Sequence, residues 1–116
     1  LKYLKGVGVE FDSRTCNWAA RGGHIHVLEY LKSEGVECDS GTYGWAAEEG
    51  HIHVLEYLKS EGVTFDEDYI CFDAVKGGHI NVLEYLKSEG VTFDEDYICF
   101  DAVKGGHINV LEYLKS

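Results

Sequence analysis

The tripeptide Gly-His-Ile occurs four times at nearly constant spacing. It begins at Gly23, Gly50, Gly78 and Gly106, so successive copies are 27, 28 and 28 residues apart. A fixed period of this length is typical of repeat proteins, in which each unit is one supersecondary element that packs on its neighbours. The chain is therefore predicted to fold as a row of similar units.

The period accounts for the whole chain of 116 residues and leaves no room for a second domain. A partial unit at 1–6 precedes four units, which occupy 7–33, 34–60, 61–88 and 89–116. The opening Leu-Lys-Tyr-Leu-Lys matches the Leu-Glu-Tyr-Leu-Lys that ends each later unit, so the chain is predicted to begin inside a helix. The last two units are identical at every position. Their identity requires recent duplication, deliberate construction or excision from a longer array, and the sequence leaves all three open.

Each unit contains two segments with helical character, and the second is predicted to be the longer. In 24–33, apolar residues recur at helical spacing on one face, and Gly35 follows as the expected stop. The upstream segment, 15–21 in the first unit, begins after Asp12, which is a good N-cap. Only glycines separate the two helices, so they are predicted to pack as an antiparallel hairpin. Since one hairpin cannot bury its own apolar face, the predicted fold is all-α, an α-solenoid of stacked antiparallel helix pairs joined by short loops.

Pairs of alanines just before the glycine turn favour close packing between units. The stretch Thr-Cys-Asn-Trp-Ala-Ala-Arg-Gly-Gly-His-Ile-His-Val-Leu-Glu-Tyr-Leu at 15–31 resembles the ankyrin repeat in its Ala-Ala, Gly-His and Val-Leu elements. The family's Thr-Pro-Leu-His start is weaker here because the chain contains no Pro. Each unit is also about five residues shorter than the usual 33. The missing residues lie between Gly35 and Asp39, where the family builds its β-hairpin finger, so the resemblance implies an ankyrin-like stack with short loops.

The chain is strongly acidic, with 21 Asp and Glu against 10 Lys and Arg and a net charge of −11. This charge repels a phosphate backbone, so nucleic acid is not an expected partner. No apolar run approaches the roughly eighteen residues of a membrane span, and no signal peptide is recognisable. We therefore expect no membrane partner, and an intracellular, cytoplasmic location is favoured.

Six histidines invite a metal hypothesis. His24 with His26, and His51 with His53, recur in adjacent units, but side chains two apart on a helix point to different sides. A shared metal ion is therefore not expected. The ankyrin resemblance implies instead that the histidine of each Gly-His pair caps or braces the turn.

The cysteines favour a packing role over a redox role. Cys16, Cys71 and Cys99 share one internal helical position, whereas Cys38 lies in a loop. The sequence contains no Cys-x-x-Cys, and equivalent positions of stacked units are too far apart to bridge comfortably. Reduced thiols are the expectation, with a disulfide as the alternative.

Acidic residues at 66–68 and 94–96 precede the first helices of the last two units. They lack the ligand spacing of a calcium loop, and carboxylates are stabilised at a helix start by the helix dipole. Asp73 and Asp101 replace the tryptophans of the first two units and are predicted at the rim of the core. No nucleophile and base can be placed in an enclosed pocket, because a stack of units offers only a groove. We therefore expect no enzyme, no metal and no cofactor.

The resemblance also implies where a partner would bind. Ankyrin-like stacks usually bind protein on the concave surface formed by the loops, the first helix and the following turn. On this chain those positions are Ser13, Arg14, Arg21, Glu48, Glu49, Glu67, Asp68, Lys76, Glu95, Asp96 and Lys104. The surface is expected to be mostly acidic, because the negative charge belongs to the last three units.

Two hypotheses for function follow. The first is a non-catalytic ankyrin-like scaffold whose acidic concave surface binds a basic or amphipathic protein segment. The alternative is a self-assembling structural protein whose uncapped ends stack head to tail into a filament, or an excerpt of a longer repeat array, either natural or engineered.

Overall fold

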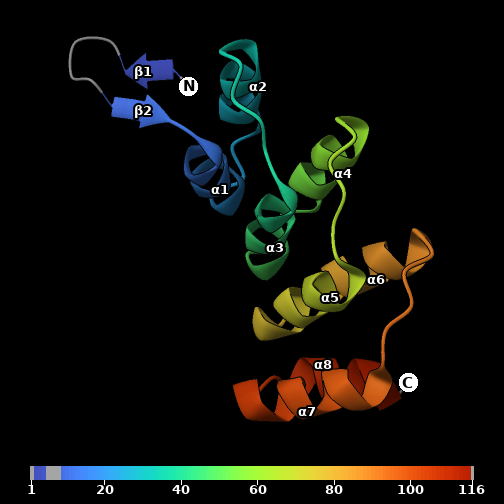
Figure 1. Cartoon of the computed structure of the whole chain (residues 1–116). Helices are drawn as coiled ribbons and strands as arrows, with labels where there is room; N and C mark the ends of the chain where they lie inside the picture. Colours follow the sequence, from blue (N-terminus) through green and yellow to red (C-terminus); the bar gives the residue numbers. More distant parts are fainter. Residues whose placement is uncertain (1, 5–8, 116) are drawn as a thin grey trace.

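The computed structural model describes residues 2–4 and 9–115. In this part of the chain, two short strands precede eight α-helices that come in four pairs (Figure 1). The strands are β1 (Lys2–Leu4) and β2 (Val9–Phe11). The helices are α1 (Ser13–Arg21), α2 (Ile25–Ser33), α3 (Ser40–Glu48), α4 (Ile52–Ser60), α5 (Glu67–Lys76), α6 (Ile80–Ser88), α7 (Glu95–Gly105) and α8 (Ile108–Lys115). Each pair belongs to one sequence unit, so we call α1, α3, α5 and α7 the first helices and the others the second helices.

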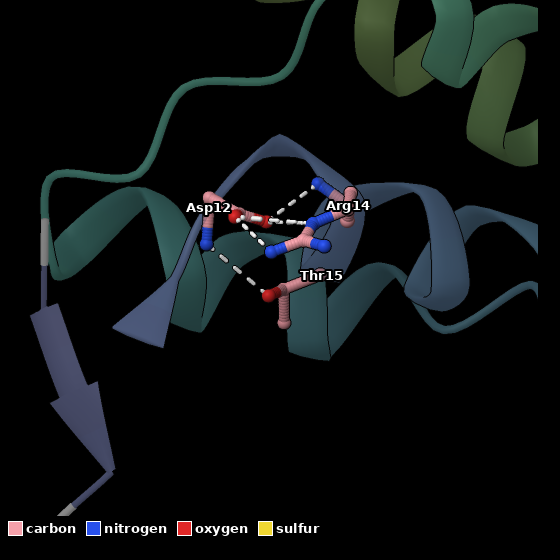
Figure 2. Close-up of polar contacts among 3 residues, drawn as sticks. All are labelled: Asp12, Arg14 and Thr15. Atoms are coloured by element: carbon pink, nitrogen blue, oxygen red, sulfur yellow. Dashed lines mark hydrogen bonds and ion pairs between the residues drawn. The ribbon is translucent and has the colours of Figure 1, made fainter. Parts of the chain in front are cut away.

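Aspartates start the first helices, as predicted. The Asp12 carboxylate accepts a hydrogen bond from the backbone N–H of Arg14 at 2.9 Å, while the Asp12 N–H donates to Oγ1 of Thr15 at 3.2 Å. Figure 2 shows this reciprocal capping box, together with the ion pair between Asp12 and Arg14. Asp39 and Asp94 cap α3 and α7 in the same position. These bonds satisfy N–H groups that a helix start leaves without partners.

Glycines with positive φ end both kinds of helix. After α1, Gly23 has φ +73° and the His24 N–H donates to the carbonyl of Ala19 at 2.9 Å. After α2, Gly35 has φ +84° and the N–H of Val36 donates in the same way to the carbonyl of Leu31. These are Schellman turns, in which only glycine adopts the left-handed backbone without strain. The predicted stop signals are confirmed, and residues 36–39, 63–66 and 91–94 contain no strand.

The helix pairs are stacked in sequence order. Each first helix contacts the next first helix, each second helix contacts the next second helix, and the two helices of a pair contact one another. Figure 1 shows this succession from the blue N-terminal end to the red C-terminal end. The radius of gyration is 15.5 Å, against about 13 Å for a globular domain of this length. The arrangement is consistent with a helical repeat.

Small side chains lie where the first helices meet their neighbours. Ala20, Ala46 and Ala47 are completely buried, and the second helices add Leu55 and Leu58 to the same continuous core. Because a methyl group fills little space, the backbones of adjacent helices approach closely. The prediction of close packing before the glycine turn is confirmed.

The prediction that the chain begins inside a helix is wrong. Residues Lys2–Leu4 form β1, which pairs antiparallel with β2 so that Lys2 lies opposite Phe11, while Leu1 and 5–8 lie outside the described residues. A segment of five residues forms too few helical backbone hydrogen bonds to offset the free-energy cost of helix nucleation. The all-α prediction therefore holds for units one to four from Ser13 onward, but not for the segment before it.

The prediction that the second helix of each unit is the longer is also wrong: the two helices have nine residues each in the first two units, and the first helix is the longer in the last two. The second helices span eight or nine residues, whereas α5 spans 10 and α7 spans 11. The second helix begins one residue later than expected because His24, and its equivalents His51 and His79, occupy the N-cap position. In the last two units the additional acidic residue lengthens the first helix at its start.

Candidate functional site: the first-helix surface

The structure places the predicted partner-binding residues at the two ends of the first helices. At or near the N-terminal ends are Ser13, Arg14, Glu67, Glu95 and Asp96, with Asp68 in the same turn of α5 although its side chain lies outside the described part. At or just beyond the C-terminal ends are Arg21, Glu48, Glu49, Lys76 and Lys104. The surface between these two sets is formed by the middle of each first helix.

Two ion pairs lie at the C-terminal ends of the first helices. The Glu49 carboxylate lies 3.8 Å from Nε of Arg21, and the Glu48 carboxylate lies 3.8 Å from Nζ of Lys76. Both are ion pairs between neighbouring units, and such exposed pairs contribute about 0 to 1 kcal/mol to stability. Since they pair charges of opposite sign, the excess negative charge of this surface lies at the N-terminal ends of α5 and α7.

Exposed aromatic side chains occupy the middle of this surface, a feature that the sequence analysis missed. Seven aromatic side chains of the described residues are largely exposed, and six of them lie on first helices. We call these six the aromatic row: Trp18, Trp45, Tyr69, Phe72, Tyr97 and Phe100. They are 38% to 71% exposed. The spacing of three between the two aromatic residues of α5, and of α7, was the available signal, because it places both on one helix face outside the alanine stripe.

A cation already stacks on one member of the row. The guanidinium carbon of Arg21 lies 5.0 Å from the ring centroid of Trp45. At this distance the positive charge is attracted by the negative face of the indole ring. The carboxylate of Glu49, 3.8 Å from Nε of the same arginine, completes an arrangement of ring, cation and carboxylate.

The spacing of the first helices varies with the side chains between them. A Cβ atom on Gly44 would lie only 2.4 Å from Oδ2 of Asp73, so α3 and α5 approach closely at this glycine. In α5, the position of Gly44 is taken by Phe72 and that of Gly41 by Tyr69. These large rings separate α5 from α7.

The result is an open hollow of about 680 Å³ between α5 and α7, against about 170 Å³ at the corresponding place between α3 and α5. We call the larger one the α5–α7 hollow. The residues lining it include Tyr69, Phe72, Phe93, Asp94, Tyr97 and Asp101.

Asp73 and Asp101 lie half-buried at the rim of the core, as predicted. For Asp73, burial against α3 raises the pKa of the carboxyl to about 6, with a further increase from the neighbouring Glu48 carboxylate and an opposing effect of Lys76. The physical cause is desolvation, which disfavours the charged carboxylate. A small fraction of Asp73 is therefore protonated at neutral pH.

Two of the histidines of the Gly-His pairs, His51 and His107, brace the turn of the preceding unit. Nε2 of His51 lies 3.0 Å from the carbonyl oxygen of Arg21, and Nε2 of His107 lies 2.9 Å from that of Lys76. Since a carbonyl can only accept, the ring nitrogen must donate its proton. The predicted bracing role is confirmed, but it acts between units, and His51 makes no side-chain capping bond to its own helix.

The polar residue two positions after the histidine of each Gly-His pair contacts the turn of the preceding unit in two of the units. Nε2 of His53 lies 3.2 Å from the carbonyl oxygen of Gly23, and Nδ2 of Asn109 donates to that of Gly78 at 2.9 Å. Both side chains are exposed. Histidine and asparagine can both occupy this position, because each side chain places an N–H donor at a similar distance from its own backbone.

The expectation that His24 and His26 point to different sides is wrong. Their rings are in edge contact, with centroids 5.8 Å apart. The reason is that His24 precedes the helix and has a non-helical backbone, with φ −96° and ψ 81°. Even so, within 2–4 and 9–115 no group of three or more His, Cys, Asp or Glu side chains is arranged to hold a metal ion.

The three cysteines at the shared helical position differ in burial. Cys16 and Cys71 are buried, whereas Cys99 is exposed, which contradicts the prediction of an internal position in every unit. All four cysteines are free thiols. The loop residue Cys38 lies close enough for its sulfur to accept a hydrogen bond from Cys16, which raises the pKa of Cys16 and lowers the pKa of Cys38. This contact between neighbouring units was not predicted.

No helix in the described part of the chain is long and apolar enough to cross a membrane. In comparisons with known proteins, no family model and no curated protein matches the chain.

Proposed function

We propose that the chain is a non-catalytic protein-binding module that holds a basic, partly apolar protein segment on its first-helix surface. The observation that carries this proposal is the aromatic row, with exposed rings on all four first helices. Several exposed aromatic side chains on one set of helices mark an interaction site, because Trp and Tyr contribute much of the binding energy of protein interfaces. The ankyrin-like character of the repeat, with partners on the same helices, agrees with this proposal.

The charge of the surface indicates the chemistry of the segment. Glu67, Glu95 and Asp96 are exposed at the starts of α5 and α7, next to the rings of Tyr69 and Tyr97. With a net charge of −11, the chain attracts cationic segments at long range. A partner that combines Lys or Arg with apolar residues would match both the carboxylates and the rings.

A synthetic peptide of alternating arginine and leucine should bind the chain, and salt should weaken the binding. The double variant Glu67→Gln with Glu95→Gln should bind it about fivefold more weakly, because each exposed charge contributes about 0.5 kcal/mol. Fluorescence anisotropy of the labelled peptide measures this. The matched control is Glu56→Gln with Glu84→Gln, which removes the same charge from exposed positions of α4 and α6. Equal weakening in both variants would show that only net charge matters and would refute the surface assignment.

We also propose self-association as a second function, because the outward face of the last unit is uncovered. Units three and four are identical in sequence, yet Val75 is completely buried whereas Val103 is 62% exposed. The face of α7 and α8 that carries Val103 and Ile108 is the same face by which α5 and α6 hold the next unit. A second copy of the chain offers a helix pair of the same kind to cover it.

On this second proposal, the mass of the chain in solution should increase with protein concentration. The substitution Ile108→Lys, at a side chain that is 69% exposed, should abolish the increase because it places a charge in the contact without disturbing the core. Light scattering over a hundredfold concentration range measures both. A constant mass near 13.0 kDa for the unmodified chain would contradict self-association and leave the peptide-binding proposal intact.

A further inference from the structure

We propose that the α5–α7 hollow is a binding pocket for an arginine side chain of the protein partner. This inference rests on the proposed function, since it assigns one specific contact within the first-helix surface. The hollow has a volume of about 680 Å³, against about 170 Å³ at the corresponding place between α3 and α5. It is open to solvent along the row, so a side chain can enter it while its backbone stays outside.

Aromatic rings form the walls of the pocket. Tyr69 and Phe72 line it from α5, Tyr97 lines it from α7, and Phe93 lines it from the preceding loop. Tyr69 and Tyr97 are each 71% exposed, so their ring faces are available to a ligand. Rings in this arrangement stabilise a cation that lies within about 6 Å of their centroids.

Three carboxylates line the hollow, those of Asp66, Asp94 and Asp101. Oδ1 of Asp66 accepts a hydrogen bond from the backbone N–H of Tyr69 at 3.4 Å. Oδ1 of Asp94 accepts hydrogen bonds from two backbone N–H groups in the first turn of α7, at 3.0 and 3.3 Å. Asp101 is half-buried, and in the described part of the chain its carboxylate has no hydrogen-bond or ion-pair partner. A half-buried carboxylate beside aromatic rings favours a cationic ligand that can also donate hydrogen bonds.

The first two units show the same chemistry with a ligand from the chain itself. There Arg21 stacks on the ring of Trp45 and lies near the carboxylate of Glu49. Lys104 occupies in unit four the repeat position that Arg21 occupies in unit one. Among the described residues that line the hollow, Lys104 is not present. The α5–α7 hollow thus supplies rings and a carboxylate, and the partner supplies the cation.

The planarity of the guanidinium group favours arginine over lysine. Arginine stacks flat on an aromatic ring while its N–H groups donate to a carboxylate in the ring plane. The lysine ammonium is a compact, strongly hydrated charge that gains less from a ring. We therefore expect the pocket to distinguish the two cations.

The test uses N-acetylarginine amide and N-acetyllysine amide as probes, titrated into the full chain and followed by NMR signals of the Tyr69 and Tyr97 rings. The arginine probe should bind in the millimolar range, and the lysine probe several-fold more weakly. The variant Asp101→Asn should weaken the arginine probe about tenfold, because it removes one charge-assisted hydrogen bond. The control Asp73→Asn makes the same change at the same repeat position beside the smaller hollow and should alter binding less than twofold. Circular dichroism establishes that both variants keep their helices.

Three results would overturn the arginine pocket: no ring shifts at millimolar probe, equal binding of the two probes, or equal weakening by both variants. Binding of the peptide of alternating arginine and leucine shows whether only the pocket fails or the proposed function fails as well. If the peptide binds the unmodified chain and Asp101→Asn binds it equally well, the surface assignment stands and the pocket does not. If the peptide does not bind at all, the proposed function itself fails.

Discussion

Replacing Val75 by lysine should destabilise the chain by about 4 kcal/mol or more, whereas the same replacement of Val103 should change stability by less than about 0.5 kcal/mol. The two valines occupy the same position in units of identical sequence. Val75 is completely buried between α5 and its neighbours, and Val103 is 62% exposed on α7. An ammonium group at position 75 would lose its hydration without gaining a partner, while one at position 103 would stay in water.

Urea unfolding followed by circular dichroism measures both variants against the unmodified chain. Since small domains are stable by only about 5–15 kcal/mol, the Val75→Lys chain should be partly or fully unfolded without denaturant. Local helix propensity and sequence context are identical at the two positions, so the difference reports burial alone. The measurement is made at a protein concentration at which light scattering shows a single copy of the chain, so that self-association does not cover the outer face of α7. Equal destabilisation by the two substitutions under this condition would contradict the structure, in which Val103 is 62% exposed.

Replacing Gly78 by alanine should cost about 1 kcal/mol more than replacing Gly106 by alanine. Both glycines have a left-handed backbone, with φ +71° and +74°, so each substitution incurs the same strain of roughly 1–2 kcal/mol. At Gly78 the added Cβ would also lie 2.7 Å from Nδ1 of His107, whereas at Gly106 nothing lies within 4 Å. The imidazole must therefore move, and its hydrogen bond to the Lys76 carbonyl is lost, at a cost of about 1 kcal/mol.

The same unfolding measurement tests this difference, and a double-mutant cycle assigns it. In a His107→Ala background, Gly78→Ala and Gly106→Ala should cost the same, since the side chain that distinguishes them is gone. A difference that persists in this background would show that His107 is not the cause.

The elements that local sequence determines were predicted well. Asp12, Asp39 and Asp94 start helices, and Gly23 and Gly35 end them, because capping depends on residues within one turn of the helix end. The order of the units follows from the Gly-His-Ile period in the same way. These features need no knowledge of what packs on each helix.

The features that were missed depend on neighbours along the stack. Cys71 and Cys99 have identical flanking sequences, yet one is buried and the other exposed, so no local pattern could distinguish them. The aromatic row was not predicted, because no local pattern shows that α3 and α5 pack through Gly44 and the alanines while Tyr69 and Phe72 stay exposed. The strand at Lys2–Leu4 was missed because its sequence matches a helix end elsewhere in the chain.

The aromatic pair that separates α5 from α7 has a consequence for valency. The wide separation of neighbouring first helices is expected wherever a unit presents this tyrosine and phenylalanine to the next unit. Unit three carries the pair as Tyr69 and Phe72, and unit four carries it as Tyr97 and Phe100. A row built from more copies of this 28-residue unit would therefore repeat the hollow once per copy, with centres about 10 Å apart. A segment in the polyproline II conformation has three residues per turn and rises about 3.1 Å per residue, so a basic side chain at every third residue could then occupy several hollows together. Its avidity would increase with the number of units although each contact stayed weak.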